Sequence, residues 1–203
     1  SNSTISGNDA PNTGGGINAE AGSTTITNST IANNGIRYGG GGLNIKSSAT
    51  GTVTNSILST NPGNCRGPGA FVSGGHNITD DATCGFAAPG DLINTNPLLG
   101  PLANNSGPTW THAVLLGSPA LDQGSAGGVF TDQRGMLRPL DLAYVPNTTD
   151  GSDIGAYEYI DIPPTLSPIA AHVTDEDSAT SPIAVTVGDA ETPPSALRLS
   201  AVS

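Results

Sequence analysis

Paired carboxylates are the residues of this 203-residue chain that could do chemistry. Cleavage of a glycosidic bond needs two of them on one surface, one acting as acid and the other as base or nucleophile. Asp80 and Asp81 are adjacent, follow His76 closely and lie between Cys65 and Cys84. Adjacent carboxylates in a polar segment are also ordinary turn residues. We therefore interpret Asp80 and Asp81 as a solvated turn and assign no catalytic residue there.

The densest group of charged side chains lies between residues 122 and 158. Its members are Asp122, Asp132, Arg134, Arg138, Asp153 and Glu158. An acidic carbohydrate site is one interpretation. The one we favour is a structural network, in which forked guanidinium groups bind carboxylates and backbone carbonyls. The three isolated histidines (His76, His112 and His172) are expected to be structural or exposed. Trp110, the only tryptophan, is expected in the core.

The charge balance excludes nucleic acid as a partner. The net charge is −11 and the sequence pI is about 4.2, whereas phosphate binding needs clustered basic side chains. The six basic residues are scattered, at Arg37, Lys46, Arg66, Arg134, Arg138 and Arg198. Acidic residues gather beyond residue 160, where Asp175, Asp177 and Asp189 are candidate Ca²⁺ ligands because Ca²⁺ prefers carboxylate oxygens. Apart from that ion, no cofactor is expected.

Cys65 and Cys84 are the only cysteines. A single pair in a chain rich in Gly and poor in Lys favours a disulfide, and therefore an oxidising compartment. In the chain-entropy model, closing a loop of this size stabilises the fold by about 3 kcal/mol. No segment is apolar enough to span a membrane, and no signal peptide is present. We expect an internal fragment of an exported protein.

The elements that position these residues belong to a repeat. Asn2-Ser3-Thr4-Ile5 recurs at residues 28–31 and, as Asn-Ser-Ile-Leu, at residues 55–58. A glycine landmark, residues 14–18, recurs at 40–44, and residues 25–28 recur at 52–55. Three landmarks that share a step of 26 or 27 residues indicate a repeat architecture. Leucine-rich and Ca²⁺-binding nonapeptide repeats do not fit, because neither signature is present.

The predicted fold is all-β, a right-handed parallel β-helix with one coil per repeat. Equivalent residues of successive coils would then stack about 4.8 Å apart. The predicted ladders are one of isoleucines (Ile5, Ile31 and Ile57) and one of asparagines (Asn2, Asn28 and Asn55). Residues 1–61 form the regular coils, 62–100 a coil with the disulfide loop, and 101–160 a cap that closes the open end. Residues 161–203, after a linker with two prolines, are expected to begin an incomplete β-sandwich module.

Three motifs in the predicted cap carry a family resemblance. They are residues 117–124 (GSPALDQG), 131–135 (TDQRG, with Arg138-Pro139) and 153–158 (DIGAYE), preceded by 96–102 (NPLLGPL) and 109–112 (TWTH). In this order they resemble the choice-of-anchor Q domain, which ends right-handed β-helix repeats in large bacterial surface proteins. The segment 174–193 resembles the start of bacterial Ig-like or cadherin-like modules. The resemblance implies an exported, envelope-anchored protein and supplies no catalytic residue.

We therefore expect a non-enzymatic structural or adhesive segment of a secreted or surface-anchored protein. Its partners would be an extracellular polysaccharide or a surface protein. The alternative is a fragment of a β-helix polysaccharide lyase or hydrolase whose active site lies outside this segment. In the regular coils the acids are Asp9 and Glu20, and neither recurs at the coil step.

Overall fold

The computed structural model describes the chain except for residues 11–13, 37–40, 174, 180, 190–196 and 201–203. The chain divides into two units, Ser1–Tyr159 and Ile160–Ser203. The described residues form an all-β structure without a helix, as the sequence predicts. Gly40, the first residue of the second glycine landmark, lies outside the described residues.

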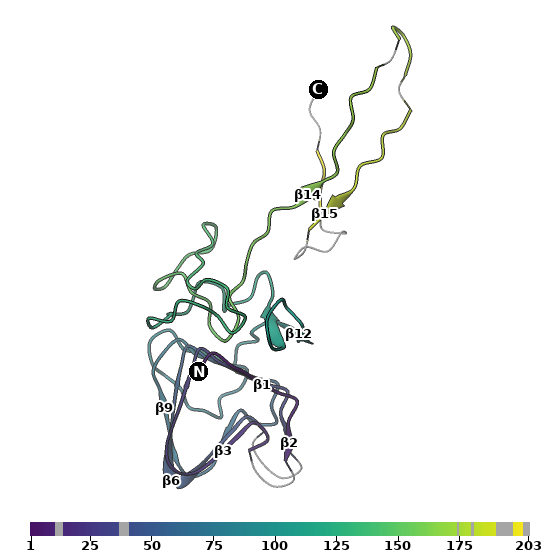
Figure 1. The fold of residues 1–203 in the computed structure, drawn as a ribbon. Helices are drawn as coiled ribbons and strands as arrows, with labels where there is room; N and C mark the ends of the chain where they lie inside the picture. The colour runs from purple at the N-terminus through teal and green to yellow at the C-terminus, as the bar shows by residue number, and fades with distance from the viewer. Residues whose placement is uncertain (11–13, 37–40, 174, 180, 190–196, 201–203) are drawn as a thin grey trace. The chain divides into compact units, whose positions relative to one another are not determined.

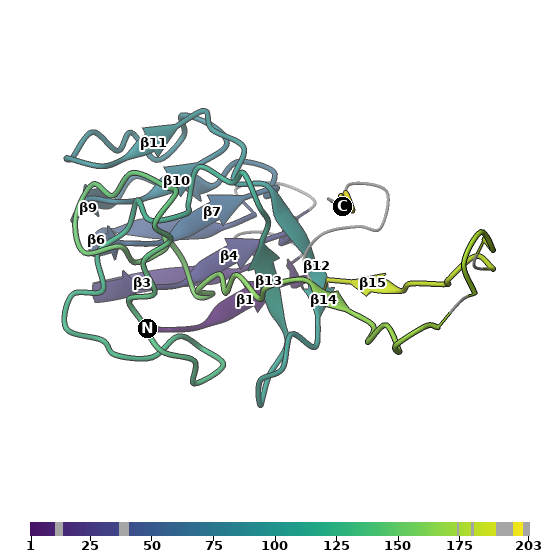
Figure 2. The same ribbon diagram turned by 90° about the horizontal axis from the view of Figure 1, so that it is seen from above.

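The first sheet of unit 1 contains five short strands, each parallel to the next (Figure 2). In sheet order they are β1 (Thr4–Ser6), β4 (Thr30–Ala32), β7 (Ile57–Ser59), β10 (Ile78–Thr79) and β11 (Leu92–Ile93). In sequence, paired residues of neighbouring strands are 26, 27, 21 and 14 residues apart, so the first two steps equal the repeat and the last two are shorter. We call the stretch of chain from one of these strands to the next a passage.

Two further parallel sheets connect these strands. The second sheet contains β3 (Ile17–Thr27), β6 (Leu43–Thr54), β8 (Cys65–Arg66) and β9 (Ala70–Ser73), and the third contains β2 (Asp9–Ala10) and β5 (Gly35–Ile36). In Figure 1 the three sheets lie on different sides of a common interior. Two antiparallel pairs follow, β12 (Leu99–Ala103) with β13 (Thr111–Val114), and, in unit 2, β14 (Thr165–Leu166) with β15 (Val187–Gly188).

The predicted isoleucine ladder is wrong at its third member. Ile5 pairs with Ile31, but Ile31 pairs with Leu58, and Ile57 pairs with Thr30. The Asn-Ser anchor sets this register, because Asn55-Ser56 aligns with Asn28-Ser29 and leaves Ile57 opposite a threonine. A shift of one residue turns a side chain to the other face of a sheet. Ile57 therefore points away from the interior that Ile31 and Leu58 fill.

A β-bulge absorbs the difference between the steps of 26 and 27 residues. Ala19 pairs with Ile45, but Ala21 pairs with Ser48, so Glu20 lies opposite two residues of β6, Lys46 and Ser47. Such an insertion bends the strand and leaves the extra residue unpaired. Pairs before the bulge keep the step of 26, and pairs after it, such as Thr25 with Thr52, keep the step of 27.

Two hydrophobic clusters bury the two faces of the first sheet. The interior cluster includes Ile31, Leu58, Leu43 and Val53 together with the disulfide. The outer cluster joins Ile57 and Ile78 to side chains from residues 114–159. Because Ile57 and Leu58 are both fully buried, β7 is covered on both sides. Cys65 and Cys84 form the predicted disulfide.

The predicted asparagine ladder holds for one of its two steps. Asn55 Nδ2 donates to Asn28 Oδ1 at 2.7 Å. Asn2 instead donates its amide to the Thr131 carbonyl (2.9 Å). All three asparagines adopt positive φ, at 55°, 49° and 46°, a region that asparagine tolerates better than most residues. His76 takes the next position in this column, with φ 55°.

A second asparagine column, which we did not predict, lies at the other end of the same strands. The Asn8 N–H donates to Asn34 Oδ1 (3.1 Å), and the Asn34 N–H donates to Asn61 Oδ1 (2.9 Å). Asn61 Nδ2 then donates to Asn64 Oδ1 (2.8 Å), and Asn64 Nδ2 to Asp80 Oδ1 (2.7 Å). Each side-chain oxygen accepts a hydrogen from the residue before it in the column, so the column has one direction.

A serine column beside the first bend runs in the same direction. The Ser3 N–H donates to Ser29 Oγ (3.4 Å), and the Ser29 N–H donates to Ser56 Oγ (3.1 Å). Asn77 Oδ1 accepts the Ser56 N–H (3.0 Å), and Asp91 Oδ1 accepts the Asn77 N–H (3.0 Å). Both columns end on an aspartate, which suits the position because an ionised carboxylate only accepts hydrogen bonds.

Asn61→Ala should test the columns. Asn61 also donates to the Ile31 carbonyl (3.0 Å), so the change removes the acceptor of the buried Asn34 N–H and one donor to the Ile31 carbonyl. Each orphaned group costs about 1–3 kcal/mol. We expect the free energy of unfolding, measured by urea denaturation, to fall by about 2–4 kcal/mol on that scale. Asn147→Ala, at an exposed asparagine outside the columns, is the control and should cost much less.

Candidate functional site

The charged group predicted between residues 122 and 158 is brought together in unit 1. Arg138 and Glu158 form a fully buried ion pair, with Arg138 Nε 2.7 Å from Glu158 Oε2. Arg138 Nη2 also donates to the Gly155 carbonyl (2.9 Å), and Glu158 Oε1 accepts the Leu140 N–H (2.8 Å). Through these bonds the ion pair connects the backbone at Leu140 and Gly155 with residues 138 and 158.

Arg134 and Asp132 form a second pair beside the first. Arg134 Nε is 2.8 Å from Asp132 Oδ2, and the guanidinium carbon lies 3.6 Å from the centre of the Tyr157 ring. Asp132 also accepts the backbone N–H groups of Met136 (3.0 Å) and Glu158 (3.0 Å). The aspartate therefore organises a turn as well as neutralising the arginine.

The remaining two acids of the group, Asp153 and Asp122, are buried and bind backbone amides. Asp153 Oδ1 accepts the Asp122 N–H (2.9 Å), and its Oδ2 accepts the Tyr159 N–H. Asp122 Oδ2 accepts the Leu142 N–H (3.0 Å). Burial, together with the charge of Glu158, raises the pKa of Asp153 well above its usual value. Burial also raises the pKa of Glu158, against the opposing effect of Arg138.

Hydrogen bonds join residues 122–159 to the column of Asn2, Asn28 and Asn55 in successive passages. Asn55 Oδ1 accepts the Ser125 N–H (3.0 Å), and Asn55 Nδ2 donates to the Asp153 carbonyl (3.1 Å). Asn28 Nδ2 donates to the Ala126 carbonyl (3.3 Å). The segment expected to close the open end therefore covers the outer face of the first sheet. Its burial of Ile57 and Ile78 explains this position.

Trp110 contradicts its predicted place in the core, because 60 % of its surface is exposed. The outer cluster is filled instead by aliphatic side chains and Tyr159. The backbone carbonyl of Trp110 accepts a bond from Gln133 Nε2 (3.4 Å). The Gln133 bond therefore fixes the backbone of the loop before β13, and the indole ring lies at the surface.

Asp80 and Asp81 are more than a solvated turn. Asp80 Oδ2 accepts the Thr60 N–H (2.6 Å) and the Ser59 hydroxyl (2.9 Å), in addition to its bond from Asn64. Asp81 Oδ2 accepts the Asn64 N–H (3.0 Å). Burial acts to raise the pKa of Asp81, but hydrogen bonds from Thr83 and Asn64 outweigh it and lower the pKa. Both carboxylates therefore accept hydrogen bonds from Asn64, the last asparagine of the column.

The three histidines differ in their surroundings. His112 is buried, with Nδ1 2.8 Å from the Gly100 carbonyl and Nε2 2.8 Å from Ser6 Oγ. His76 Nδ1 lies 2.8 Å from the Gln123 carbonyl. His172 is exposed in unit 2. His76 and His112 thus link the first-sheet passages to the loops that cover them.

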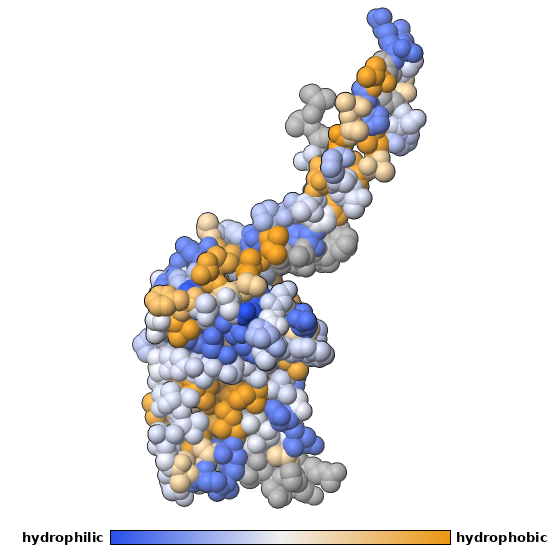
Figure 3. All heavy atoms as spheres, in the orientation of Figure 1, coloured by the Kyte–Doolittle hydropathy of each residue, from blue (hydrophilic) through white to orange (hydrophobic). Residues whose placement is uncertain are grey.

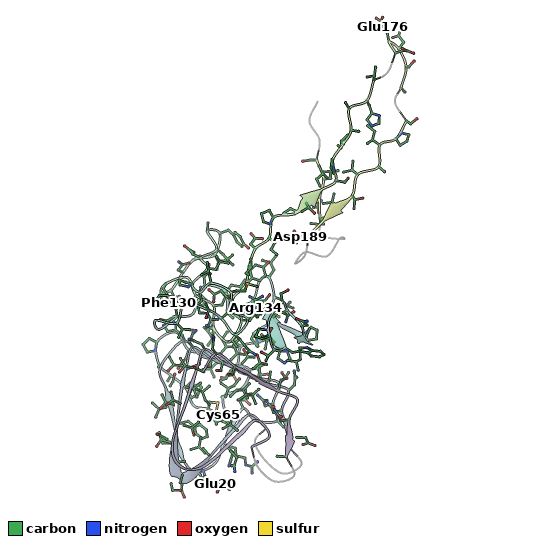
Figure 4. The ribbon with its side chains drawn as sticks, viewed as in Figure 1. Glu20, Cys65, Phe130, Arg134, Glu176 and Asp189 are labelled. Atoms are coloured by element: carbon green, nitrogen blue, oxygen red, sulfur yellow. A yellow bond between two sulfur atoms is a disulfide. The ribbon has the colours of Figure 1, made fainter. Side chains whose placement is uncertain are left out.

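The proposed Ca²⁺ ligands do not come together in unit 2. Asp175 and Asp177 flank Glu176 at the far tip of the excursion between β14 and β15, whereas Asp189 lies next to β15 at its base (Figure 4). Among the described residues, no group of three or more His, Cys, Asp or Glu side chains is arranged to hold a metal ion. Nor do these residues contain a helix long and apolar enough to cross a membrane.

Comparison of the chain with protein-family models, with curated proteins and with solved structures found no match. The geometry of the site must therefore be interpreted by itself. Each carboxylate of the group between residues 122 and 158 accepts at least one backbone N–H, and two of them pair with arginines. Such side chains are held in place by many bonds, which suits a structural role.

Arg138→Met should destabilise unit 1 strongly. Removing one partner leaves the Glu158 charge buried without compensation, which typically costs about 3–5 kcal/mol. We expect a loss of that size in the free energy of unfolding, measured by denaturation. Arg138→Met combined with Glu158→Leu should recover part of it. Arg66→Met, at an exposed arginine, is the control and should change stability little.

The stability of unit 1 should fall as the pH rises from about 4 to 7. Asp153 and Glu158 hold their protons more tightly folded than unfolded, and unfolded Asp and Glu titrate near pH 4. At a pH between the unfolded and the folded pKa values, the native state binds more protons than the unfolded state. Raising the pH in that range therefore favours unfolding. Below pH 4 the trend should reverse, because Asp81 and Asp150 have lowered pKa values.

Melting temperatures measured across this pH range would check the prediction. Asp153→Asn should flatten the slope between pH 4 and 7, whereas Asp9→Asn, at an exposed acid of β2, should keep it. A slope that is unchanged in Asp153→Asn would contradict the assignment.

Proposed function

We propose that residues 1–159 are a segment of a right-handed parallel β-helix with a structural or adhesive role in an exported bacterial surface protein. The in-register parallel pairing of successive passages supports the β-helix. The three motifs that resemble the choice-of-anchor Q domain all lie in the segment that covers the first sheet. The disulfide between Cys65 and Cys84 is consistent with export.

The observation that carries the non-enzymatic role is the engagement of the carboxylates. A general acid or base must have an oxygen that can reach a substrate proton. Asp81 and Asp91 accept backbone N–H groups with both of their oxygens. Asp80 accepts the Thr60 N–H and two side-chain donors, again with both oxygens. Arg138 and Glu158 are fully buried. These groups therefore stabilise turns and loops, and the proposed binding role falls to other parts of the surface.

A β-helix suits display because its passages form a rigid, extended surface. The partner we propose is an extracellular polysaccharide or another surface protein. The acidic charge of the chain favours neutral or basic partners. In unit 2, β14 and β15 would be the first strands of an Ig-like or cadherin-like module.

An activity and binding screen on neutral and acidic polysaccharides would test this role. We expect no release of reducing or unsaturated sugar ends by the chain, because its acids are held in structural bonds. Sugar release that disappears in Asp80→Asn, with melting unchanged, would contradict the structural role of these acids and place an active site within this segment.

Arg134→Ala separates the structural and binding interpretations of the charged network. The change removes the pair with Asp132 and the contact with Tyr157, and we expect a loss of about 1.5–3 kcal/mol of stability, the range for hydrogen bonds to charged groups. Polysaccharide retention measured well below the melting temperature should be unchanged. Lost retention at unchanged melting would assign Arg134 to a binding site.

A further inference from the structure

The outer face of the second sheet carries a regular array of hydroxyl groups. In β3 and β6 the side chains alternate, and Ile26 and Val53 point into the interior, where both are buried. The side chains at the alternate positions of each strand face outward. They are Ser23, Thr25 and Thr27 on β3 and Thr50, Thr52 and Thr54 on β6, and we call them the threonine face.

The two rows of the threonine face are in register. Ser23 pairs with Thr50, Thr25 with Thr52 and Thr27 with Thr54. Outward residues of one parallel strand are about 6.6 Å apart, and neighbouring strands are about 4.8 Å apart. The hydroxyl and methyl groups therefore form a two-dimensional lattice. Figure 1, viewed along the stack, shows the strands nearly superimposed, so the lattice has little twist.

The β9 strand extends the shape of this lattice without its hydroxyls. Ala70 pairs with Thr50 and Val72 with Thr52, and valine has nearly the outline of threonine. β9 follows β6 on the side away from β3, so the face is three strands wide. Its outward side chains are all small or β-branched.

The face carries neither charge nor aromatic rings that point outward. Residues 23–27, 50–54 and 70–74 contain no charged side chain, and Phe71 packs against the interior cluster. Glu20 and Lys46 lie at the bulge, beyond the array. Figure 3, in the orientation of Figure 1, shows this side of unit 1 only at its edge, where most of the spheres are pale.

We propose that the threonine face binds ice. An ice surface presents water molecules in a regular two-dimensional lattice, and a regular lattice of hydroxyl and methyl groups can order the water next to it. Threonine has a stiff χ1 angle, so the hydroxyls are positioned before contact and lose little freedom on binding. A charged group on this face would order the nearby water around itself and disturb that lattice. The inference rests on the strand register alone and is independent of the proposed surface role.

A polysaccharide is the rival occupant, and the structure favours it less at this face. Sugar rings are commonly held by stacking on aromatic side chains with directed polar groups around them. The threonine face has no such ring. The exposed Trp110 belongs to the loop before β13, away from β3 and β6 in the sequence and in sheet order.

Growth of single ice crystals in a solution of the whole chain would test the proposal. We expect faceted crystals, a gap between the melting and freezing temperatures, and enrichment of the protein in slowly growing ice relative to serum albumin. Absence of the gap, the facets and the enrichment would overturn the proposal.

Variants localise the effect. Thr25→Lys and Thr52→Lys should abolish the gap, because each places a charged chain in the lattice, whereas Thr52→Val, which keeps the shape, should retain more of it. Ser47→Lys, at the exposed bulge of the same strand, is the control and should behave like the wild type. Circular-dichroism melting should show that all four variants fold.

Two outcomes would overturn the assignment even if the protein acts on ice or another solid. One is an undiminished gap in Thr52→Lys. The other is retention on crystalline cellulose or chitin that the Lys variants lose, without any effect on ice, which would assign the face to a glycan.

Discussion

Parallel pairing in register is the constraint on which unit 1 depends. It places each residue directly beside its counterpart one passage later, about 4.8 Å away. Apolar positions then stack on apolar positions, and buried polar positions must satisfy one another. The serine and asparagine columns are the result, since each N–H at a bend is accepted by the side chain of the next passage.

The columns have a direction, and that direction explains the acids near their ends. In the serine column and in the column through Asn8, Asn34 and Asn61, every step donates from an earlier residue to a later one, so the last member needs only to accept. Asp80, Asp81 and Asp91 occupy these places. Carboxylates that suggest catalysis in the sequence are thus the ends of hydrogen-bonded columns. In the loops that cover the first sheet, Asp132, Asp153 and Glu158 likewise accept hydrogen bonds from backbone N–H groups.

The repeat and its period were predictable because identical residues had to recur where identical positions stack. The disulfide followed from there being two cysteines. The face of Ile57 was mispredicted because the similarity to Ile31 outweighed the more reliable Asn-Ser anchor. The column through Asn8, Asn34 and Asn61 was readable from its spacing, but a spacing does not reveal which asparagine is buried. Trp110 and the position of residues 101–159 depend on contacts between distant segments, which no local pattern encodes.

The β-bulge at Glu20 shows how such a chain can change length. One added residue in β6 left the pairs on both sides of the bulge intact, so the two rows of the threonine face remain aligned. Without the bulge, the extra residue would have turned every following side chain over. Duplication of a whole passage would preserve the columns, whereas a single added residue keeps the paired faces only where a bulge absorbs it. Changes in length are therefore compatible with this architecture as whole passages or as bulges, and the paired faces keep a fixed pattern.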